Sequence, residues 1–265
     1  MKIKEVIDYL DSVFHPELQE DYDNSGFLLG NGETEFRGAL VALDLTEAVV
    51  DEAVEAGDIN LIVTHHPFIF SGLKRLTDGD TTGRLVWSLI QNNIAVYAAH
   101  TNLDNLPWGV SGALGERLGL QNCHILQPLA NKPEAGAGLV GELPQAEPVE
   151  AFLLRLKKIL GLPTIRTSSL ITQHSSFKIK RVALCGGAGS FLIEEALAAG
   201  ADVYLTGDLK YHDFQRTDGR MVLADIGHYE SEQFAKEIIF RAVSEKFCNF
   251  AVRISERQGS IVQYI

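Results

Sequence analysis

Continuous apolar runs alternate with helical patterns along the first part of the chain. Residues 38–44 and 59–64 are apolar runs typical of buried strands, and residues 47–57 between them place alanine, valine and acid at helical spacing. Gly57 ends the expected helix, as glycine often does. Residues 94–100 form a further apolar run. Strands that alternate with helices of about ten residues predict an α/β architecture with a largely buried sheet.

A later region repeats the same order. Residues 181–185 and 202–206 are apolar runs, and the segment between them predicts a helix that ends at Gly200. Residues 221–228 then correspond to residues 94–100. We therefore expect two partly similar α/β lobes.

The repeat also sets the expected domain limits. The first lobe covers residues 1–124 and the second covers residues 179–265. Residues 125–178 do not repeat, are punctuated by prolines such as Pro133 and Pro144, and contain one helical pattern at 150–160. We expect this middle segment to be a connecting subdomain without chemistry.

Composition narrows the class of protein. With 265 residues and 46% hydrophobic content, the chain can bury a substantial core. The net charge of -12 disfavours nucleic acid and anionic lipid as partners, because phosphate binding needs clustered cations. Neither a membrane span nor a signal peptide is evident, and three scattered cysteines suit a reducing compartment. These features predict a cytoplasmic protein without disulfides.

Two adjacent histidines, His65 and His66, follow the apolar run at 59–64. They would emerge at the carboxyl edge of the sheet, where open α/β folds bind their ligands. Neighbouring side chains of an extended chain point to opposite sides, so the pair would more easily serve two metals than chelate one. The alternative interpretation is a pair of surface histidines at a strand end.

A histidine and a carboxylate four residues apart occur at matching positions in both lobes. His228 and Glu232 can share one face of a first helical turn, which suits a single ion, although Glu232 could instead cap that helix. Asp104 follows His100 at the same spacing and could bridge two cations or serve as a turn residue. Histidine and carboxylate ligands without thiolate suit Zn²⁺, Mn²⁺, Fe²⁺ or Ni²⁺.

Six motifs, in order, resemble those of the NIF3-like family, whose members are also described as dinuclear-metal-centre hexameric proteins and as homologues of a type 2 GTP cyclohydrolase 1. They are DNSGFLLG at 23–30, THHP at 64–67, AHTNLD at 99–104, CGGAGS at 185–190, TGDLKYHD at 206–213 and GHYESE at 227–232. The resemblance covers almost the whole chain.

This resemblance implies a two-lobed α/β fold, a toroidal homohexamer and two divalent metal ions per chain. The metal ligands of the family fall on five residues here, each with its residue type retained: His65, His66, Asp104, His228 and Glu232.

Further residues are candidates for a role beside the metals. Lys210 and His212 could contact a substrate or transfer protons, and a structural His–Asp contact is the alternative. Asp44 could orient a ligand histidine, and His100 and Tyr229 could support the ligands or line a pocket.

Other motifs have structural explanations. The glycine-rich turn at 186–189 lacks the lysine of a phosphate-binding loop, so close backbone packing is the favoured interpretation and anion binding the alternative. His15, His124 and His174 lie outside the motifs, where we expect solvent or turn positions.

We interpret these candidate residues together as the site of a metal-dependent hydrolase that acts on a small nucleotide-like substrate. Two cations joined by a carboxylate would lower the pKa of a shared water and polarise a carbonyl, imine or phosphoryl oxygen. The alternative is a non-catalytic ring protein that binds, stores or delivers metal, or presents a surface to partners. A catalytic site would keep open coordination positions, whereas a storage site would be closed by protein ligands.

Overall fold

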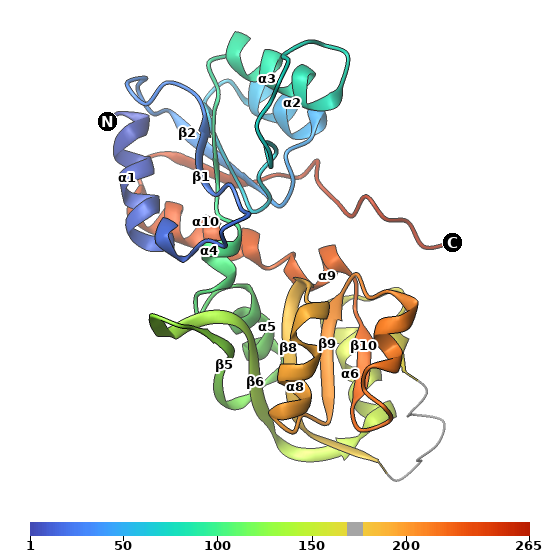
Figure 1. Cartoon of the computed structure of the whole chain (residues 1–265). Helices are drawn as coiled ribbons and strands as arrows, with labels where there is room; N and C mark the ends of the chain where they lie inside the picture. The colour runs from blue at the N-terminus through green and yellow to red at the C-terminus, as the bar shows by residue number, and fades with distance from the viewer. Residues whose placement is uncertain (169–176) are drawn as a thin grey trace. The chain divides into compact units, whose positions relative to one another are not determined.

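A computed structural model of the chain describes residues 1–168 and 177–265. The chain divides into two compact units, each of which is built from two separate segments (Figure 1). Unit 1 comprises Met1–Leu103 and Ala235–Gly259, and unit 2 comprises Asp104–Phe234 and Ser260–Ile265.

Unit 1 contains a sheet of short, mostly apolar strands. Its order across the sheet is β1-β4-β3-β2-β11, and all strands except β1 run parallel. The strands are β1 (Gly26–Leu29), β2 (Gly38–Ala42), β3 (Leu61–Thr64), β4 (Ala95–Ala98) and β11 (Ala251–Ile254). Every residue of β2, β3 and β4 is buried, as expected for parallel strands that are covered on both faces.

Helices cover both faces of this sheet. The helical segments are α1 (Ile3–Phe14), η1 (Pro16–Leu18), α2 (Glu47–Ala56), α3 (Thr81–Gln91) and α10 (Ala235–Lys246). Side chains of α2 and α3 pack with Leu40, Ile62 and Val96 in one buried cluster. Tyr97, the residue after Val96 in β4, points to the other face of the sheet. There its hydroxyl donates a hydrogen bond to the Asp11 carboxylate of α1. Gly57 caps α2 with a left-handed φ of 71°, which confirms the predicted end of that helix.

Unit 2 contains a mixed sheet. Its order is β5-β6-β8-β9-β10-β7, in which β8, β9 and β10 are parallel and the other pairs are antiparallel. The strands are β5 (Gln121–Leu129), β6 (Lys132–Pro148), β7 (Arg166–Thr167), β8 (Lys178–Ala188), β9 (Val203–Gly207) and β10 (Val222–Asp225).

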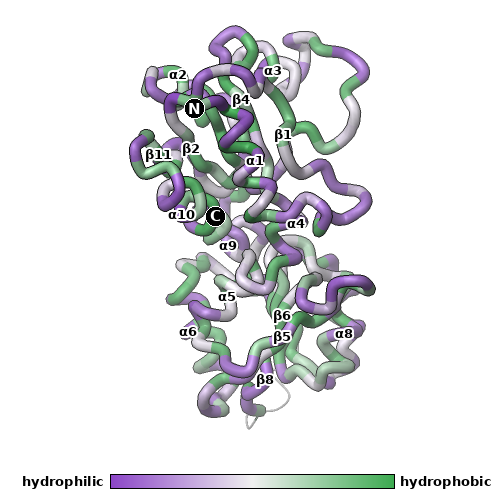
Figure 2. The backbone as a smooth tube through the Cα atoms, turned by 90° about the vertical axis from the view of Figure 1, so that its left-hand side faces the viewer, coloured by the Kyte–Doolittle hydropathy of each residue, from purple (hydrophilic) through white to green (hydrophobic). Residues whose placement is uncertain are grey.

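The helices of unit 2 are mostly short. They are α5 (Val110–Leu118), α6 (Val149–Leu160), η2 (Ser190–Leu192), α8 (Ile193–Ala198), η3 (Tyr211–Gln215) and α9 (His228–Glu232). Ile193 and Ala196 of α8 pack with Ala183, Tyr204 and Leu223 on one face of the sheet. In Figure 2, hydrophobic residues gather along the strands and hydrophilic residues along the surface loops.

The two sheets share one pattern. Strands β2, β3 and β4 of unit 1 and β8, β9 and β10 of unit 2 are each three successive, parallel, neighbouring strands. The predicted mixed α/β architecture with two partly similar lobes is therefore present in the fold.

The boundaries of the two compact units differ from those of the three segments expected from the sequence. Residues 235–259 belong to unit 1, because β11 pairs in parallel with β2, with Ala251 opposite Gly38. Within the segment at 125–178, β6 pairs with β8 and therefore joins the sheet of unit 2. Residues 169–176 of that segment lie outside the described residues.

Within residues 1–168 and 177–265, no helix is both long and apolar enough to cross a membrane.

Candidate metal centre

The adjacent histidines extend the carboxyl end of β3. The backbone N–H of His65 donates to the Ala42 carbonyl at 3.2 Å, and that of His66 donates to Leu43 at 2.9 Å. The hydroxyl of Thr64 also donates to the His66 carbonyl at 2.8 Å. These bonds fix the backbone, so both imidazoles leave the sheet edge from defined positions, as the apolar run predicts.

A third histidine joins them in unit 1. His100 follows β4, the neighbour of β3, and its ring centroid lies 5.3 Å from that of His65 and 5.5 Å from that of His66. One ring nitrogen of each histidine lies within 4.8 Å of the others, close enough for the three to hold a metal ion. His100 is therefore a stronger candidate for a metal ligand than its position in the sequence indicated.

Each of these rings is oriented through its Nδ1 atom. The Nδ1 of His65 lies 2.7 Å from the Ala99 carbonyl oxygen, and that of His66 lies 2.7 Å from Asp44 Oδ1. A carbonyl or carboxylate oxygen only accepts, so Nδ1 carries the proton and, in the neutral ring, Nε2 carries the lone pair. Metal-binding histidines are commonly held in this way. The Asp44 contact matches the orienting role expected from the sequence.

His100 is oriented by Asp23, whose carboxylate is fully buried. Its Nδ1 lies 2.7 Å from Asp23 Oδ1, and the same carboxylate accepts hydrogen bonds from the hydroxyls of Ser25 and Thr101. Burial raises the pKa of Asp23, but the bonds from His100, Thr101 and Ser25 outweigh it and hold this pKa well below its usual range. A permanent carboxylate therefore fixes the His100 ring.

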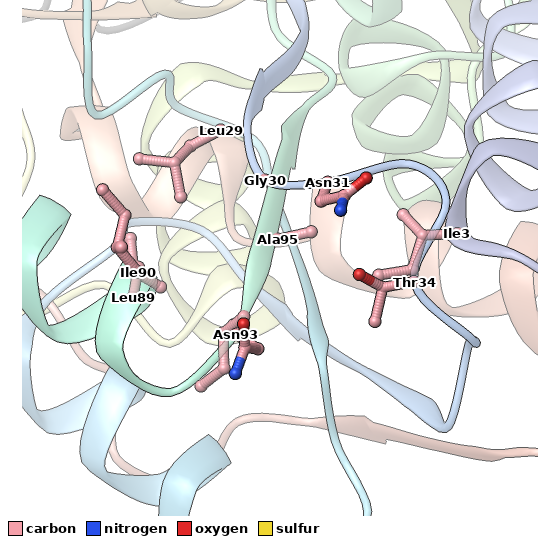
Figure 3. A pocket seen from close by; sticks show the side chains of 10 residues that line it. Ile3, Leu29, Gly30, Asn31, Thr34, Leu89, Ile90, Asn93 and Ala95 are labelled. Carbon is pink, nitrogen blue, oxygen red and sulfur yellow. The ribbon is translucent and has the colours of Figure 1, made fainter.

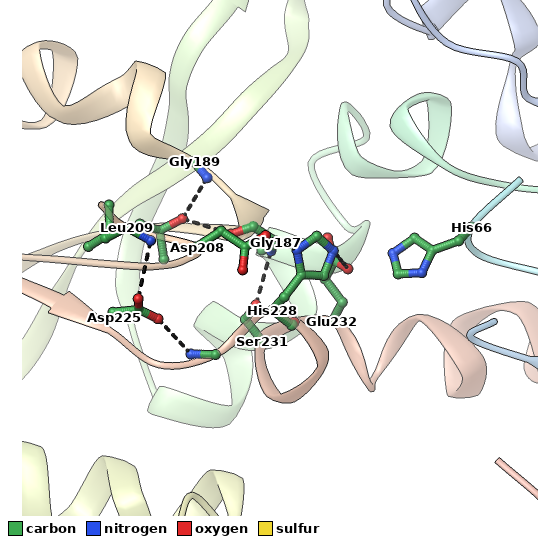
Figure 4. Close-up of polar contacts among 12 residues, drawn as sticks. His66, Gly187, Gly189, Asp208, Leu209, Asp225, His228, Ser231 and Glu232 are labelled. Atoms are coloured by element: carbon green, nitrogen blue, oxygen red, sulfur yellow. Dashed lines mark hydrogen bonds and ion pairs between the residues drawn. The ribbon is translucent and has the colours of Figure 1, made fainter. Parts of the chain in front are cut away.

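Unit 2 supplies a histidine–carboxylate pair on α9. His228 Nε2 lies 2.9 Å from Glu232 Oε2, so the spacing of four residues places both groups on one face, as predicted (Figure 4). The Nδ1 of His228 lies 2.8 Å from Asp208 Oδ2, which repeats the arrangement seen in unit 1. Asp208 has a left-handed φ of 55°, a conformation that few non-glycine residues adopt.

The glycine-rich end of β8 packs directly on the Glu232 carboxylate. Gly187 has a φ of +60°, and a Cβ built on it would lie 2.1 Å from Glu232 Oε1. Its N–H donates to the hydroxyl of Ser231 at 2.9 Å, and the N–H of Gly189 donates to Thr206 at 2.9 Å (Figure 4). These amides are occupied by hydroxyls, so close packing explains the glycines better than anion binding.

Asp104 is the last residue of α4 (Thr101–Asp104) and the first residue of unit 2. Burial raises the pKa of the Cys185 thiol, and the nearby carboxylates of Asp104 and Glu232 raise it further. The residue Cys185 is half-buried, and its thiol is thus kept neutral beside two carboxylates of unit 2.

Of the two candidates for catalysis, Lys210 directly precedes η3 and His212 lies on it, and both residues are exposed. The backbone N–H of Lys210 donates to Asp213 Oδ2 at 2.8 Å, and His212 Nδ1 lies 3.4 Å from Gln215 Oε1. Their catalytic role stays a prediction. Tyr229 is half-buried on α9.

The histidines outside the motifs have the positions expected of them where the structure describes them. His15 and His124 are exposed, whereas His174 lies outside the described residues.

Unit 1 also has a hollow of about 280 Å³ away from the histidines. It is lined by residues such as Leu29, Ile90 and Ala95 (Figure 3). No ionisable side chain belongs to its lining among the residues that the structure covers, so it offers no acid–base or metal chemistry.

The donor groups in both units fit divalent cations. Imidazole nitrogens and carboxylate oxygens bind borderline and hard cations, and hydrogen bonds to oxygen acceptors orient His65, His66, His100 and His228. These clusters could therefore hold metal ions.

Known proteins resemble the chain over its full length. A Clostridium perfringens protein named GTP cyclohydrolase 1 type 2 homolog is 34% identical, over 100% of this chain and 95% of that protein. The crystal structure of the Staphylococcus aureus hypothetical protein SA1388 is 30% identical with a TM-score of 0.89, and covers 100% of this chain and 99% of its own.

A Bacillus cereus protein related to NIF3 has the same fold. Its TM-score is also 0.89, at 24% identity, over 100% of this chain and 99% of that chain. Residues 1–259 match the family described as Duf34/NIF3 (NGG1p interacting factor 3). The resemblance predicted from six motifs is confirmed: this chain belongs to the Duf34/NIF3 family.

Proposed function

We propose that the chain binds two divalent metal ions, with His65, His66, Asp104, His228 and Glu232 as ligands, and acts as a metal-dependent hydrolase on a small nucleotide-like substrate. The observation that carries the proposal is the orientation of three of these ligands. His65, His66 and His228 each direct Nδ1 to an oxygen acceptor, which is the support that metal-binding histidines require.

The protein's own groups have distinct roles in this proposal. Glu232 is held against the Gly187 backbone, so its carboxylate has a restricted position. His100, fixed by the Asp23 carboxylate, is placed to accept or deliver a proton at Nε2. Bound divalent cations would supply Lewis acidity that polarises the bond to be hydrolysed.

The choice of substrate class rests on the relatives. The Clostridium perfringens relative carries the name of a GTP cyclohydrolase 1 type 2 homolog. A purine nucleotide is therefore the first substrate to test, followed by phosphoesters and cyclic amides, which the same chemistry can hydrolyse.

The test combines metal analysis with turnover. We expect about two divalent ions per chain by elemental analysis, and a loss of metal in His66→Ala and Glu232→Ala. His124→Ala, which removes an exposed histidine outside the site, is the matched control. Unchanged metal content in both ligand variants would contradict the site.

Turnover separates the two candidate functions. For a hydrolase, the metal-loaded protein converts at least one substrate of the panel, and Asp104→Ala abolishes this conversion. A metal-loaded protein that is inert across nucleotides, phosphoesters and cyclic amides would favour a metal-binding or storage protein instead.

We also propose the toroidal homohexamer that the family resemblance implies. Large apolar side chains on the surface support assembly, since Trp87, Ile90 and Leu154 are 48%, 53% and 70% exposed in the single chain. Light scattering should give a mass near six times the 29.1 kDa of one chain. A mass of one or two chains at micromolar concentration would contradict the hexamer.

A further inference from the structure

The connection between β3 and α3 is long and irregular. It runs over residues 65–80, none of which belongs to a helix or strand of the described chain. Connections of more than about 12–15 residues without secondary structure are uncommon in compact domains, and many of them are lids or binding loops. Its first residues, His65 and His66, belong to the histidine cluster of unit 1. The loop therefore begins within the candidate metal site.

Both ends of this loop are anchored to unit 1. Phe68 packs against the buried cluster of the sheet, and the Ile69 carbonyl accepts a hydrogen bond from the Asn24 side chain at 2.6 Å. At the other end, the Asp80 carboxylate caps α3 by accepting a hydrogen bond from the Gly83 N–H at 2.8 Å. The loop is thus tethered on both sides of its middle part.

We call the middle part, residues 70–79, the flap. Every residue of the flap is exposed. Within the part of the chain that the structure describes, no hydrogen bond involves residues 70–76. Gly72 has nothing within 4 Å of a Cβ built on it, so its backbone has room to turn. A segment with so few contacts opens and closes at a low cost in free energy.

The flap also exposes apolar side chains next to the histidines. Phe70, Leu73 and Leu76 are 51%, 42% and 48% exposed. The ring centroid of Phe70 lies 6.3 Å from that of His100, and the two rings are nearly perpendicular at 79°. This contact places the base of the flap beside the histidine cluster. Closure of the flap over the cluster would remove apolar surface from water, which favours the closed state.

Two adjacent cations, Lys74 and Arg75, lie in the middle of the flap. Both are exposed, and no carboxylate of the described residues lies within 4.0 Å of either charged group. This holds for Asp78 and Asp80 of the same loop as well. In a chain with a net charge of -12, two cations without a carboxylate partner beside a candidate metal site are available to an anionic ligand.

We propose that the flap binds the oxyanionic group of a ligand seated at the histidine cluster and closes over it, with Lys74 and Arg75 as the anion contacts. A phosphate or carboxylate group offers acceptors to both cations, and a guanidinium can bind it through two parallel hydrogen bonds. The open flap lacks these bonds, so the anion favours the closed form. The inference deepens the proposed function, on which it rests for the metal ions, and it concerns binding alone.

Limited proteolysis of the full-length, metal-loaded protein measures closure. Chymotrypsin cleaves after Phe70, Leu73 or Leu76 of the open flap, so the cleavage sites do not include the two cations. Inorganic phosphate and succinate are the probes, and cleavage at other positions of the chain is the internal reference. We expect at least one probe to slow cleavage of the flap about fivefold or more, because only the open flap can enter the protease.

Two double variants test the anion contacts. Lys74→Gln combined with Arg75→Gln should weaken the protecting anion about tenfold or more in calorimetry and abolish the protection. Lys157→Gln combined with Lys158→Gln is the matched control, because it removes two adjacent exposed cations from α6. The control should keep both the affinity and the protection. Neither double variant changes a proposed metal ligand, so the metal content should stay the same in both.

The outcomes separate the flap from the proposed hydrolase. Protection by phosphate alone, or by succinate alone, supports the flap and identifies the anionic group that it binds. If neither anion protects the metal-loaded protein, or if protection survives the loss of both flap cations, the inference is overturned, whatever the turnover. A protein that is inert in every turnover assay but still shows protection that depends on these cations would remove the hydrolase and leave the flap standing.

Discussion

The α-carbon of Gly187 lies so close to the side chain of Glu232 that a single methyl group there would lie 2.1 Å from Oε1. The glycine-rich end of β8 and the carboxylate on α9 therefore define each other's position. This relationship links a glycine-rich motif, which the sequence presents as a separate feature, to a candidate metal ligand.

Gly187→Ala should lower the metal content by displacing Glu232. The substitution also forces alanine into a left-handed conformation, which costs about 1–2 kcal/mol. Gly161→Ala is the matched control, because Gly161 lies in the same unit with a φ of +65° and nothing within 4 Å of an added Cβ.

Both variants should lose similar stability in chemical denaturation, and only Gly187→Ala should lose metal by elemental analysis. If the two variants keep equal metal content, Gly187 has no role in positioning Glu232.

Asp44→Asn should weaken metal binding without removing a ligand. The asparagine oxygen can still accept the hydrogen bond from His66 Nδ1, which lies 2.7 Å from Asp44 Oδ1 in the unmodified chain. A neutral amide polarises the imidazole less than a carboxylate does, so His66 becomes a weaker metal ligand. We expect a loss of about ten- to hundredfold in affinity, measured by competition with a chelator. Asp58→Asn, whose carboxylate pairs with Arg253 on the surface of the same unit, should leave the affinity unchanged.

Asp208→Gly should remove the carboxylate that orients His228 while keeping the left-handed backbone conformation at this position. Glycine adopts the φ of 55° without strain, so the fold should be retained, while His228 loses the acceptor that orients its ring. Metal affinity should fall about tenfold or more.

The control for that experiment is Asp218→Gly, an exposed residue of the same unit with a φ of 47°. A similar loss of metal affinity in both glycine variants would show that the effect comes from backbone freedom and not from the lost carboxylate.

The Asp23 carboxylate should make stability depend on pH in the acid range. Its pKa is lower in the folded chain than in the unfolded chain, so its contribution is present above the ordinary carboxyl pKa of about 4 and is lost as the pH falls below that value. Asp23→Asn removes this titration and should cost about 1–3 kcal/mol at pH 7.

Denaturant titrations at pH 7 and at about pH 3 measure the effect. The stability difference between the wild type and Asp23→Asn should shrink at the lower pH. A difference that stays constant across this range would mean that Asp23 stabilises the fold without its charge.

The local pattern of the sequence predicted much of the fold. Apolar runs predicted β2, β3 and β4, and helical spacing ended by glycine predicted α2, because hydrophobic periodicity and capping act over a few residues. The spacing of His228 and Glu232 predicted their common helical face for the same reason.

Contacts between distant residues were decided only by the tertiary structure. The pairing of β11 with β2 joins residues about 200 positions apart, and no local pattern specifies such a partner. Asp23 and His100 are 77 residues apart, and Asp208 and His228 are 20 residues apart. The sequence by itself therefore identified the candidate metal ligands, whereas the folded chain decided which carboxylates orient His66, His100 and His228, because hydrogen-bond partners depend on how distant segments pack.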